Sequence, residues 1–496
     1  MIGSALPLLV VLSSLLAGLI IFTLPEGRRG LRTVINLTGA LSKLVLIGFM
    51  LWGVYHGVEY ELRYPLLPGL DLVLRADPLA LLFVTLSAGL WLLTTVYAIA
   101  YLEHEGSGNR SRFFGFFSLC VSATVGIAMA GNPFTFFVFY EILTLVTYPL
   151  VVHRGTEAAL RAGRVYLAYT LSGGVVLLVG LVWLYALAGP VEFAAGGVLA
   201  DAGLSHGILV ALFVLLIGGL GVKCALFPLH GWLPVAMVAP APVSALLHAV
   251  AVVKAGAFGI VRVVYEIYGV EFARDLGLMW PLASLAAFTI IYASLRALMQ
   301  EDLKRRLAFS TVSQLSYIVL GVAIVGPLAT LGGVVHLVHQ GVMKITLFFC
   351  AGNYAETLHI HRVSELNGVG RRMPWTTAAF TVGALGMMGM PPIAGFVSKW
   401  YLGLGALESG QGLWIAVLAG STLLNAAYFL PLLYRAWFLP TTAGWADPRP
   451  RPETGRALLW PPVITAAISL LIGLFAAAAW SPLAWTALAT REQYAP

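Results

Sequence analysis

The feature that most constrains this chain is a succession of long apolar runs from one end to the other. Each run holds roughly 18 or more apolar residues, enough for a helix that crosses a bilayer and satisfies its own backbone. With 59% hydrophobic and only 10% charged residues, the chain cannot cover itself with a water-soluble surface. The sequence therefore predicts an all-α polytopic membrane protein.

Charged or Pro/Gly-rich breaks divide the chain into about fourteen spans. No basic residue precedes the first span, which favours a retained helix over a signal peptide. The largest hydrophilic stretches, 55–77, 359–373 and 441–456, are predicted to be loops. The expected spans are 4–24, 32–55, 77–101, 113–131, 133–152, 163–189, 206–228, 241–265, 276–298, 307–325, 328–353, 375–407, 411–438 and 457–488.

The basic residues are distributed unevenly between the connections. Of the 29 Lys and Arg residues, 19 fall in odd-numbered connections, and four fall in even-numbered ones: Arg63, Arg75, Arg262 and Arg274. Cytoplasmic loops carry such an excess of positive charge. We expect a multi-pass protein of a bacterial or archaeal cell (inner) membrane with both termini outside. The net charge of +7 then reflects topology, and nothing indicates nucleic-acid binding.

Five of the six lysines lie inside apolar spans, where each costs about 2.5–3.5 kcal/mol on insertion scales. Arginine is absent from these deep positions, and lysine, unlike arginine, can lose its proton when it is desolvated. Among the carboxylates, Glu141 alone is placed in the middle of a span. This pattern indicates proton exchange along a hydrated path. The alternatives are a structural salt bridge for Glu141, and for Lys43 an orientation toward the membrane surface or a neighbouring subunit.

Two spans are interrupted by proline close to a lysine. GLGVKCALFPLHGWLPVAMVAPAP places Pro228 after Lys223, and GMMGMPPIAGFVSKWYLG places Pro391 and Pro392 before Lys399. At membrane depth, such breaks are tolerated where the backbone is buried in protein or lines a wet cavity. Matching breaks point to an inverted-repeat transporter, so we expect two inverted five-helix repeats with broken seventh and twelfth helices. The expected regions are 1–112, 113–266 (first repeat), 267–440 (second repeat) and 441–496.

Histidines accompany these lysines. In GGVVHLVHQGVMKITLFF, His336, Gln340 and Lys344 recur every four residues with His339 beside them, which makes one polar stripe on a helix. Histidine titrates near neutrality and can pass a proton to lysine. No carboxylate or cysteine is spaced to complete a metal site with these histidines. The predicted proton path comprises Glu141, Lys223, His248, Lys254, His336, His339, Lys344 and Lys399, with Lys43, His230 and Gln340 as further candidates.

Other site chemistry is missing from the sequence. Cys120, Cys224 and Cys350 are far apart and odd in number, which fits neither a disulfide framework nor a redox pair. No nucleotide-binding loop, haem pair, iron–sulfur set or catalytic triad is found, so no cofactor and no catalytic chemistry in this chain are predicted. Any driving energy must come from an ion gradient or from a partner subunit.

Several segments resemble a known family, the proton-conducting antiporters shared by Mrp-type Na+/H+ antiporters, complex I membrane-arm subunits and membrane-bound hydrogenases. The segments are VKCALFPLHGWLPVAMVAPAPVSALLHAVAVVKAG, QEDLKRRLAFSTVSQLSY, HLVHQGVMKITLFFCAG and MPPIAGFVSKW. The resemblance spans roughly residues 75–440 and implies a fold of 14 helices with inverted repeats. YFLPLLYRAWF at the end of span thirteen is most similar to the D subunit of Mrp-type antiporters.

The resemblance also implies roles for individual residues. Glu141 and Lys223 match an acid–lysine couple in which the acid modulates the lysine. Lys254 and His248 match connecting residues; His336, His339 and Lys344 match a central relay; Lys399 matches the terminal lysine of the second half-channel.

The first hypothesis is therefore a proton-translocating subunit of a multi-subunit Mrp-type antiporter, with other membrane subunits as partners and Na+ as a candidate coupling ion. The second is a membrane-arm subunit of a redox-driven, complex I-like or hydrogenase complex. The third is a non-conducting scaffold. No cluster of oxygen ligands suited to Na+ is evident in the sequence. A partner subunit or a subunit interface is therefore the alternative location for the sodium route.

Overall fold

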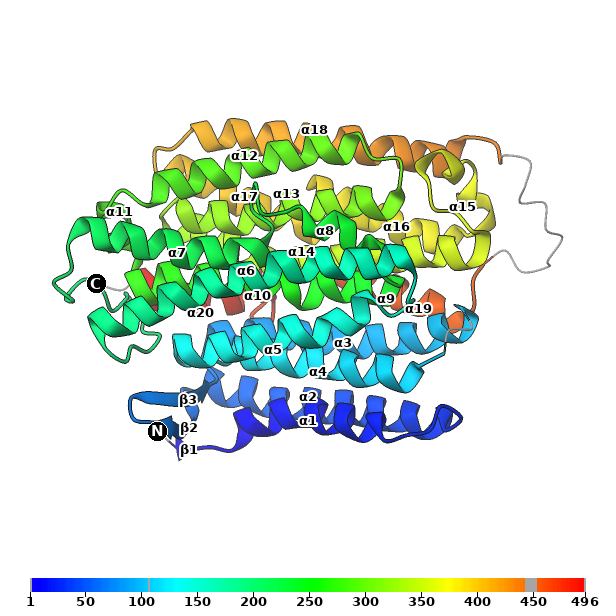
Figure 1. Ribbon diagram of the computed structural model, residues 1–496. Coiled ribbons are helices and arrows are strands. Elements are labelled where there is room, and N and C mark those ends of the chain that lie inside the picture. Colours follow the sequence, from blue (N-terminus) through cyan, green and yellow to red (C-terminus); the bar gives the residue numbers. More distant parts are fainter. Residues whose placement is uncertain (1, 106–107, 442–452, 495–496) are drawn as a thin grey trace.

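The computed structural model describes residues 2–105, 108–441 and 453–494. Most of its helices run side by side, and the two chain ends lie at the same end of the bundle (Figure 1). In chain order the α-helices are α1 (Leu6–Phe22), α2 (Arg29–Tyr55), α3 (Pro78–Glu105), α4 (Arg110–Ala128), α5 (Pro133–Val151), α6 (Glu157–Ala188), α7 (His206–Cys224), α8 (Trp232–Val235), α9 (Ala241–Ala245), α10 (Val252–Arg262), α11 (Val270–Asp275), α12 (Met279–Leu298), α13 (Leu303–Ala323), α14 (Pro327–Leu358), α15 (Val369–Arg372), α16 (Pro374–Met388), α17 (Ala394–Glu408), α18 (Leu413–Phe438), α19 (Arg456–Leu474) and α20 (Pro482–Arg491).

These helices account for the predicted spans. Within the described ranges, twelve helical segments are long and apolar enough to cross a membrane. The 17-residue α1 and the pair α16–α17 supply the remaining two of the fourteen expected spans. The fourteenth span differs from the prediction, because it divides into α19 and the shorter α20, which packs against α3 and α14. The all-α polytopic fold predicted from the sequence is confirmed.

Short polar residues begin several helices. Asn132 accepts a hydrogen bond from the Thr135 amide (2.7 Å) at the start of α5, where Pro133 occupies the first helical position. Asp302 accepts one from the Arg305 amide (2.8 Å) at the start of α13. These caps satisfy amide groups that have no partner inside the helix, so the span boundaries are encoded locally.

The seventh and twelfth spans are broken as predicted. The seventh stops at Cys224, passes through Ala225 in the left-handed region (φ 57°), and resumes as α8 and the 3-10 turn η1 (Ala236–Val238). The twelfth is interrupted between α16 and α17, where Gly389 has a φ of 91°. Glycine adopts this backbone conformation without steric cost. Pro228, Pro391 and Pro392 all lie in these breaks, and the carbonyl groups before them have no continuing helix to bond.

The eighth span is irregular as well, which the sequence patterns did not predict. It consists of α9, a π-helical turn η2 (Leu246–Val250), a kink at Ala251, α10 and a second π-helical segment η3 (Val263–Tyr268). Such turns are found in helices at functional sites. Here they surround the segment that carries His248 and Lys254.

The stretch 55–77, predicted to be a loop, instead contains a β-hairpin. Strands β2 (Tyr60–Leu67) and β3 (Leu70–Arg75) pair antiparallel, and β1 (Ile2–Gly3) adds to β2 in parallel. The sequence signal for the hairpin was the alternation of apolar and polar residues in LDLVLR, which follows a Pro-Gly turn. Gly69 in this turn has a φ of 79°. The hairpin docks on the α4–α5 turn, where the Arg75 amide donates to the Met129 carbonyl (2.6 Å) and the Gly131 amide to the Val73 carbonyl (2.9 Å).

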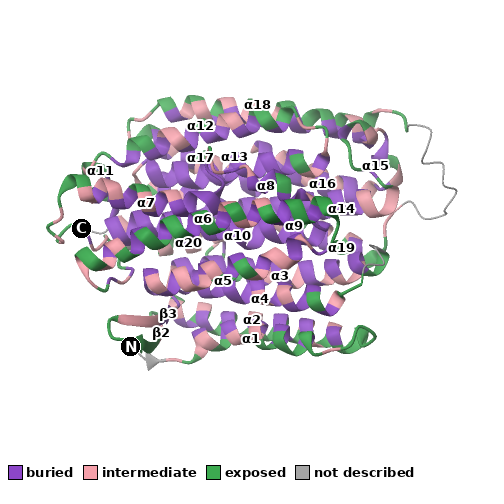
Figure 2. Ribbon diagram, viewed as in Figure 1, coloured by how far each residue is buried: buried purple, intermediate pink, exposed green. Residues whose placement is uncertain are grey.

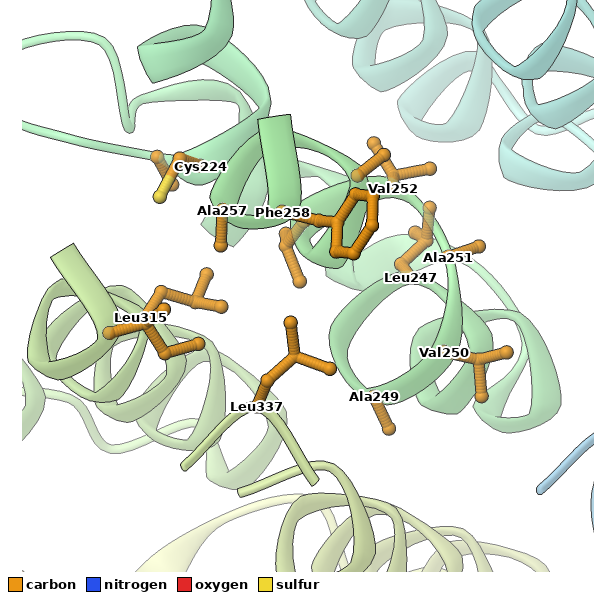
Figure 3. Packing of buried hydrophobic residues seen from close by; sticks show 14 of the residues in the cluster. Cys224, Leu247, Ala249, Val250, Ala251, Val252, Ala257, Phe258, Leu315 and Leu337 are labelled. Atoms are coloured by element: carbon orange, nitrogen blue, oxygen red, sulfur yellow. The ribbon is translucent and has the colours of Figure 1, made fainter. Parts of the chain in front are cut away.

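Three spans form the centre of the molecule. The apolar windows of Ala241–Tyr268, α13 and α14 are completely buried, whereas those of α2, α6 and α18 are only one-third buried. The same contrast between centre and rim is visible in Figure 2. Between the central helices, Ala257 and Phe258 of α10, Leu315 of α13 and Leu337 of α14 face a common space (Figure 3). The central spans are therefore enclosed by protein rather than by lipid.

Candidate functional site

Lys223 and Glu141 lie at the break in the seventh span. Lys223 is fully buried at the end of α7 and donates a hydrogen bond to the main-chain carbonyl of Tyr140, with its Nζ atom 3.3 Å from the centre of the Tyr140 ring. Glu141 follows Tyr140 on α5, and its buried Oε1 atom has no hydrogen-bond partner in the described structure. The amine is thus bound beside the carboxylate, and no ion pair is formed between them within the described residues.

A glycine on α6 provides space for the carboxylate. A Cβ atom added at Gly174 would lie 2.7 Å from the Glu141 Cδ atom and still closer to Oε1. Any larger residue at this position would displace the acid side chain. Gly174 is therefore a positioning residue of this site that the sequence patterns did not indicate.

Lys254 connects the eighth span to the eleventh. Its fully buried Nζ atom donates to the Leu337 carbonyl of α14 (2.7 Å), directly after His336. Helix α10 also packs closely on the end of α7, since a Cβ atom at Gly256 would lie 2.7 Å from the Lys223 carbonyl carbon. Lys254 therefore lies between the Lys223 break and the histidines of α14.

The polar stripe predicted on α14 is present and buried. Lys344 donates to Ser310 Oγ (2.8 Å) on α13. His248 packs against Phe348, with ring centres 4.5 Å apart. Both ring nitrogens of His248 and of His339, and both amide atoms of Gln340, lack hydrogen-bond partners in the described structure. Buried polar groups of this kind are normally satisfied by ordered water, so this region is suited to a hydrated path.

His336 connects α14 to the second break. Its Nδ1 atom is 2.7 Å from Ser398 Oγ on α17, and its Nε2 atom is 3.1 Å from Gln314 Oε1 on α13. The residue after Ser398, Lys399, donates to the Met387 and Met388 carbonyls (2.9 and 3.1 Å) at the interrupted end of α16. Tyr317 lies against both, 5.4 Å from the His336 ring and 5.2 Å from Lys399 Nζ. The break thus supplies the carbonyl groups that hold the lysine.

The four lysines of this line share one property. Lys223, Lys254, Lys344 and Lys399 each donate to main-chain carbonyl or serine oxygens, and none has a carboxylate oxygen within 4.0 Å among the described residues. A neutral oxygen can accept a hydrogen bond from an amine in either protonation state. The arrangement is therefore compatible with a side chain that gains and loses a proton.

The remaining candidates lie outside this line. Lys43 on α2 is fully buried, donates to Ser14 Oγ on α1 (2.6 Å) and lies 5.1 Å from the Trp91 ring centre on α3. No described contact joins it to the other lysines. His230 lies in the first break among aromatic rings, with the Tyr292 ring centre at 5.2 Å, and its Nδ1 atom has no described partner.

The polar face of α13 also belongs to the site, although the sequence reasoning missed it. Ser310, Gln314 and Tyr317 hold Lys344, His336 and Lys399, respectively, from one helix. Their spacing of four and three residues places them on one face of α13. The detectable signal was this polar stripe on an apolar helix, inside the family segment QEDLKRRLAFSTVSQLSY.

One expectation about charge is wrong, namely that Arg262 lies in a connection. Glu141 remains the one carboxylate predicted in the middle of a span, because Glu266 lies near a span end. The structure places Arg262 in α10 with 2% exposure, where it pairs with Glu266 in η3 and with Asp77 just before α3. The predicted span 241–265 includes Arg262 and ends one residue before Glu266, whereas the helical segment continues to Tyr268, because charged residues at a span end are tolerated when they pair.

The fold and this line of buried amines define a polytopic integral membrane protein with an ionisable interior. A family model described as the transmembrane part of "NADH:quinone oxidoreductase/Mrp antiporter" matches residues 130–425. The chain belongs to this family, as the resemblance in its sequence motifs predicted.

Relatives come from two branches of this family. The chain is 36% identical to the N subunit of the NADH-quinone oxidoreductase of Desulforudis audaxviator over 419 residues, covering 82% of each protein. It is 28% identical to the D subunit of the Na(+)/H(+) antiporter of Bacillus subtilis, covering 81% of this chain and 80% of that protein. A chain in the Mrp complex of Dietzia sp. superposes with a TM-score of 0.84 at 25% identity, covering 98% of this chain and 97% of that one.

Proposed function

We propose that this chain is the proton-translocating subunit of a multi-subunit Mrp-type monovalent cation/proton antiporter. The observation that carries the proposal is the line of four lysines held by neutral oxygens, of which Lys223, Lys254 and Lys344 are fully buried and Lys399 is half-buried. A buried amine that serves only structure needs a carboxylate partner to remain charged, and removal of one partner of such a pair is strongly destabilising. Lysines without such partners are suited to exchange protons, and the unpartnered histidine nitrogens between them are suited to bind water.

The proposed path follows the contacts between the helices. A proton exchanges near Lys223, where charge on Glu141 changes the affinity of the amine through Coulomb interaction. It passes Lys254, the His336 and Lys344 region of α14, and Lys399. Regions 113–266 and 267–440 would then act as two half-channels that meet at α10 and α14.

We place the odd-numbered connections in the cytoplasm and both termini outside. The excess of basic residues in the odd connections supports this orientation. Figure 1 is compatible with it, since both chain ends lie at one end of the bundle. Arg449 and Arg451, two of the counted residues, lie outside the described ranges.

A second function is also supported by a specific observation. The identity of 36% to a subunit of an NADH-quinone oxidoreductase exceeds the 28% identity to the D subunit of an antiporter. The same path would then serve a redox-driven complex, with electron transfer in another subunit. Purification of the complex from its native membrane distinguishes the two, because redox-active partner subunits would favour the second.

The experiment is cation-dependent proton flux into vesicles that contain the complex. We expect Lys223→Ala, Glu141→Ala and Lys399→Ala each to abolish the flux, because each interrupts the line of exchanging groups. Arg161→Ala is the matched control, since it removes a cation whose side chain is 72% exposed in a surface ion pair. Retained flux in any of the three variants would refute the assignment.

A further inference from the structure

A buried charged cluster lies where the eighth span meets the hairpin end of the bundle. One Nη atom of Arg262 donates to both carboxylate oxygens of Glu266 (2.6 and 2.5 Å), and the other donates to Asp77 Oδ2 (2.7 Å). The guanidinium lies between the Phe193 and Phe258 rings, 5.4 and 5.1 Å from their centres. The path described above does not use this cluster.

The charges of the cluster do not balance. One guanidinium faces two carboxylates, and the cluster therefore carries a net charge of −1 when all three groups are ionised. The side chains of Arg262 and Glu266 are only 2% and 8% exposed. An uncompensated charge at such burial is costly, and one added proton removes it.

The two carboxylates differ in their surroundings. Asp77 is 26% exposed and accepts a further hydrogen bond from the Ala80 amide (2.7 Å) at the start of α3, an interaction that favours the ionised form. Glu266 is more deeply buried, and among the described residues its carboxylate accepts hydrogen bonds from Arg262 alone. The added proton therefore belongs on Glu266, as a carboxylic acid.

A second observation points to an additional ligand. The Nε atom of Arg262 is buried and has no hydrogen-bond partner in the described structure. A guanidinium donor in this position is normally satisfied by water. A water molecule there would lie beside the shared carboxylates and could deliver or remove their proton.

The surrounding charged groups connect the cluster to the aqueous face. Arg75 on β3 donates to Glu61 (2.8 Å) and to Glu192 (2.6 Å), and its third contact is the Phe193 carbonyl (3.1 Å). Exposure rises from Arg262 through Asp77 to Glu192, whose side chain is 36% exposed. In the other direction, Lys254, Phe258, Arg262 and Glu266 follow at four-residue spacing along the same helical segment, each about one turn from the next.

We propose that Asp77, Arg262 and Glu266 form a proton-holding site between Lys254 and the aqueous face at the hairpin end of the bundle. The site takes one proton, shared between two carboxylates and held on Glu266. This proposal rests on the proposed function, because the site would let the lysine line exchange protons with water at that face.

The test compares Glu266→Gln and Asp77→Asn with the wild-type complex in vesicles. Each change leaves Arg262 with one carboxylate, so the cluster becomes neutral, and we expect the complex to assemble. Asp71→Asn is the control, because it removes a carboxylate of the same face that pairs with Arg63 (3.0 Å). We expect Glu266→Gln to lower proton flux at least tenfold and to abolish the dependence of the flux on pH at the hairpin face. Asp71→Asn should keep both the wild-type flux and its pH dependence.

A second measurement is independent of transport. Infrared difference spectra between two pH values should show a carboxylic acid band in the wild type and in Asp71→Asn, and this band should be missing from Glu266→Gln. If the wild type conducts no protons, the proposed function fails while the band still tests the site. Unchanged flux in an assembled Glu266→Gln complex, or a band that persists in it, would overturn the proposal. If Glu266→Gln does not assemble, the same two measurements are made on Asp77→Asn, and unchanged flux or a persisting band in it would overturn the proposal. If neither variant assembles, the cluster is a structural ion triad and the proposal fails.

Discussion

At the level of single residues, the lysine line and Arg262 differ in the partners that hold their charge. The amines of Lys223, Lys254, Lys344 and Lys399 are bound by uncharged oxygens, whereas the guanidinium of Arg262 is bound by two carboxylates. Arginine stays charged under all ordinary conditions, and the almost fully buried Arg262 has opposite charge beside it. Lysine can relieve the cost of burial by losing its proton. For the lysine line and Arg262, the partner thus matches the chemistry that each cation can perform, whereas the buried Arg306 is held by main-chain carbonyls.

The space beside Glu141 gives a prediction at this level. We expect Gly174→Ala to lower proton flux about threefold to tenfold, because the added methyl group forces the Glu141 carboxylate off its present position at a cost of ~1 kcal/mol. Gly218→Ala is the control, since its nearest neighbour outside its own helix would be Val176 Cγ1 at 4.0 Å. Flux and thermal stability of both variants are measured together. Equal flux in the two variants would show that the position of the carboxylate is unimportant.

At the level of helices and strands, interruptions supply binding groups that regular helices cannot. The break between α16 and α17 leaves the Met387 and Met388 carbonyls free to hold Lys399. Regular α-helices bond their carbonyls internally, so this lysine site requires the break. The uninterrupted α13 has the complementary role, because it presents side chains to three partners from one face.

The hairpin β2–β3 gives a prediction at the level of elements. Glu192, in the connection between α6 and α7, pairs with both Arg63 and Arg75 of the hairpin. Burial of Glu192 opposes its ionisation, but the hydrogen bonds from Arg63 and Arg75 outweigh this effect and lower its pKa. Because the pKa is lower in the folded state, the pairing stabilises the docked hairpin above the pKa of a free glutamate, about 4.3, and is lost as pH falls through the lowered value.

Hydrogen exchange of residues 60–75, corrected for intrinsic rates, tests this expectation. Protection should be constant from pH 8 to about pH 5 and should decrease below about pH 4. Glu192→Gln should reduce protection at neutral pH and remove the acid-dependent step. Glu157→Gln, which breaks an exposed pair with Arg161, should leave the hairpin unchanged. A hairpin that loses protection as pH rises would contradict the assignment.

At the level of the whole molecule, the enclosed centre and exposed rim fit a chain surrounded by lipid and other subunits. Lys254 and Lys344 lie in the fully buried central spans, Lys223 is itself fully buried at the end of α7, and Lys399 is half-buried on α17. Lysines on the lipid-facing rim could not share a hydrated path, so this arrangement is required by the proposed function.

Orientation is tested at the same level with a membrane-impermeant maleimide. We expect Asp201→Cys, in an even-numbered connection, to be labelled in intact cells, and Ser364→Cys, in an odd-numbered one, to be labelled only in inverted membranes. Both positions are exposed, whereas Cys120, Cys224 and Cys350 are fully buried and provide an unreactive background. The unmodified chain is the control. The opposite labelling pattern would reverse the proposed orientation.

The sequence by itself determined the spans, the two proline breaks and the buried lysines. A bilayer requires each span to satisfy its own backbone within a contiguous segment, so this information is local and can be read from composition and spacing. The same locality made LDLVLR recognisable in principle as a strand.

Only the tertiary structure decided how the ionisable groups are partnered. Arg262 pairs with Asp77 from 185 residues earlier in the chain, and His336 bonds Ser398 from 62 residues later. Gly174 leaves room for the Glu141 carboxylate only because α6 packs against α5. Charge pairing and burial depend on segments that are brought together by packing, and no local pattern records which segments these are. The distinction between exchanging amines and a paired guanidinium therefore belongs to the fold.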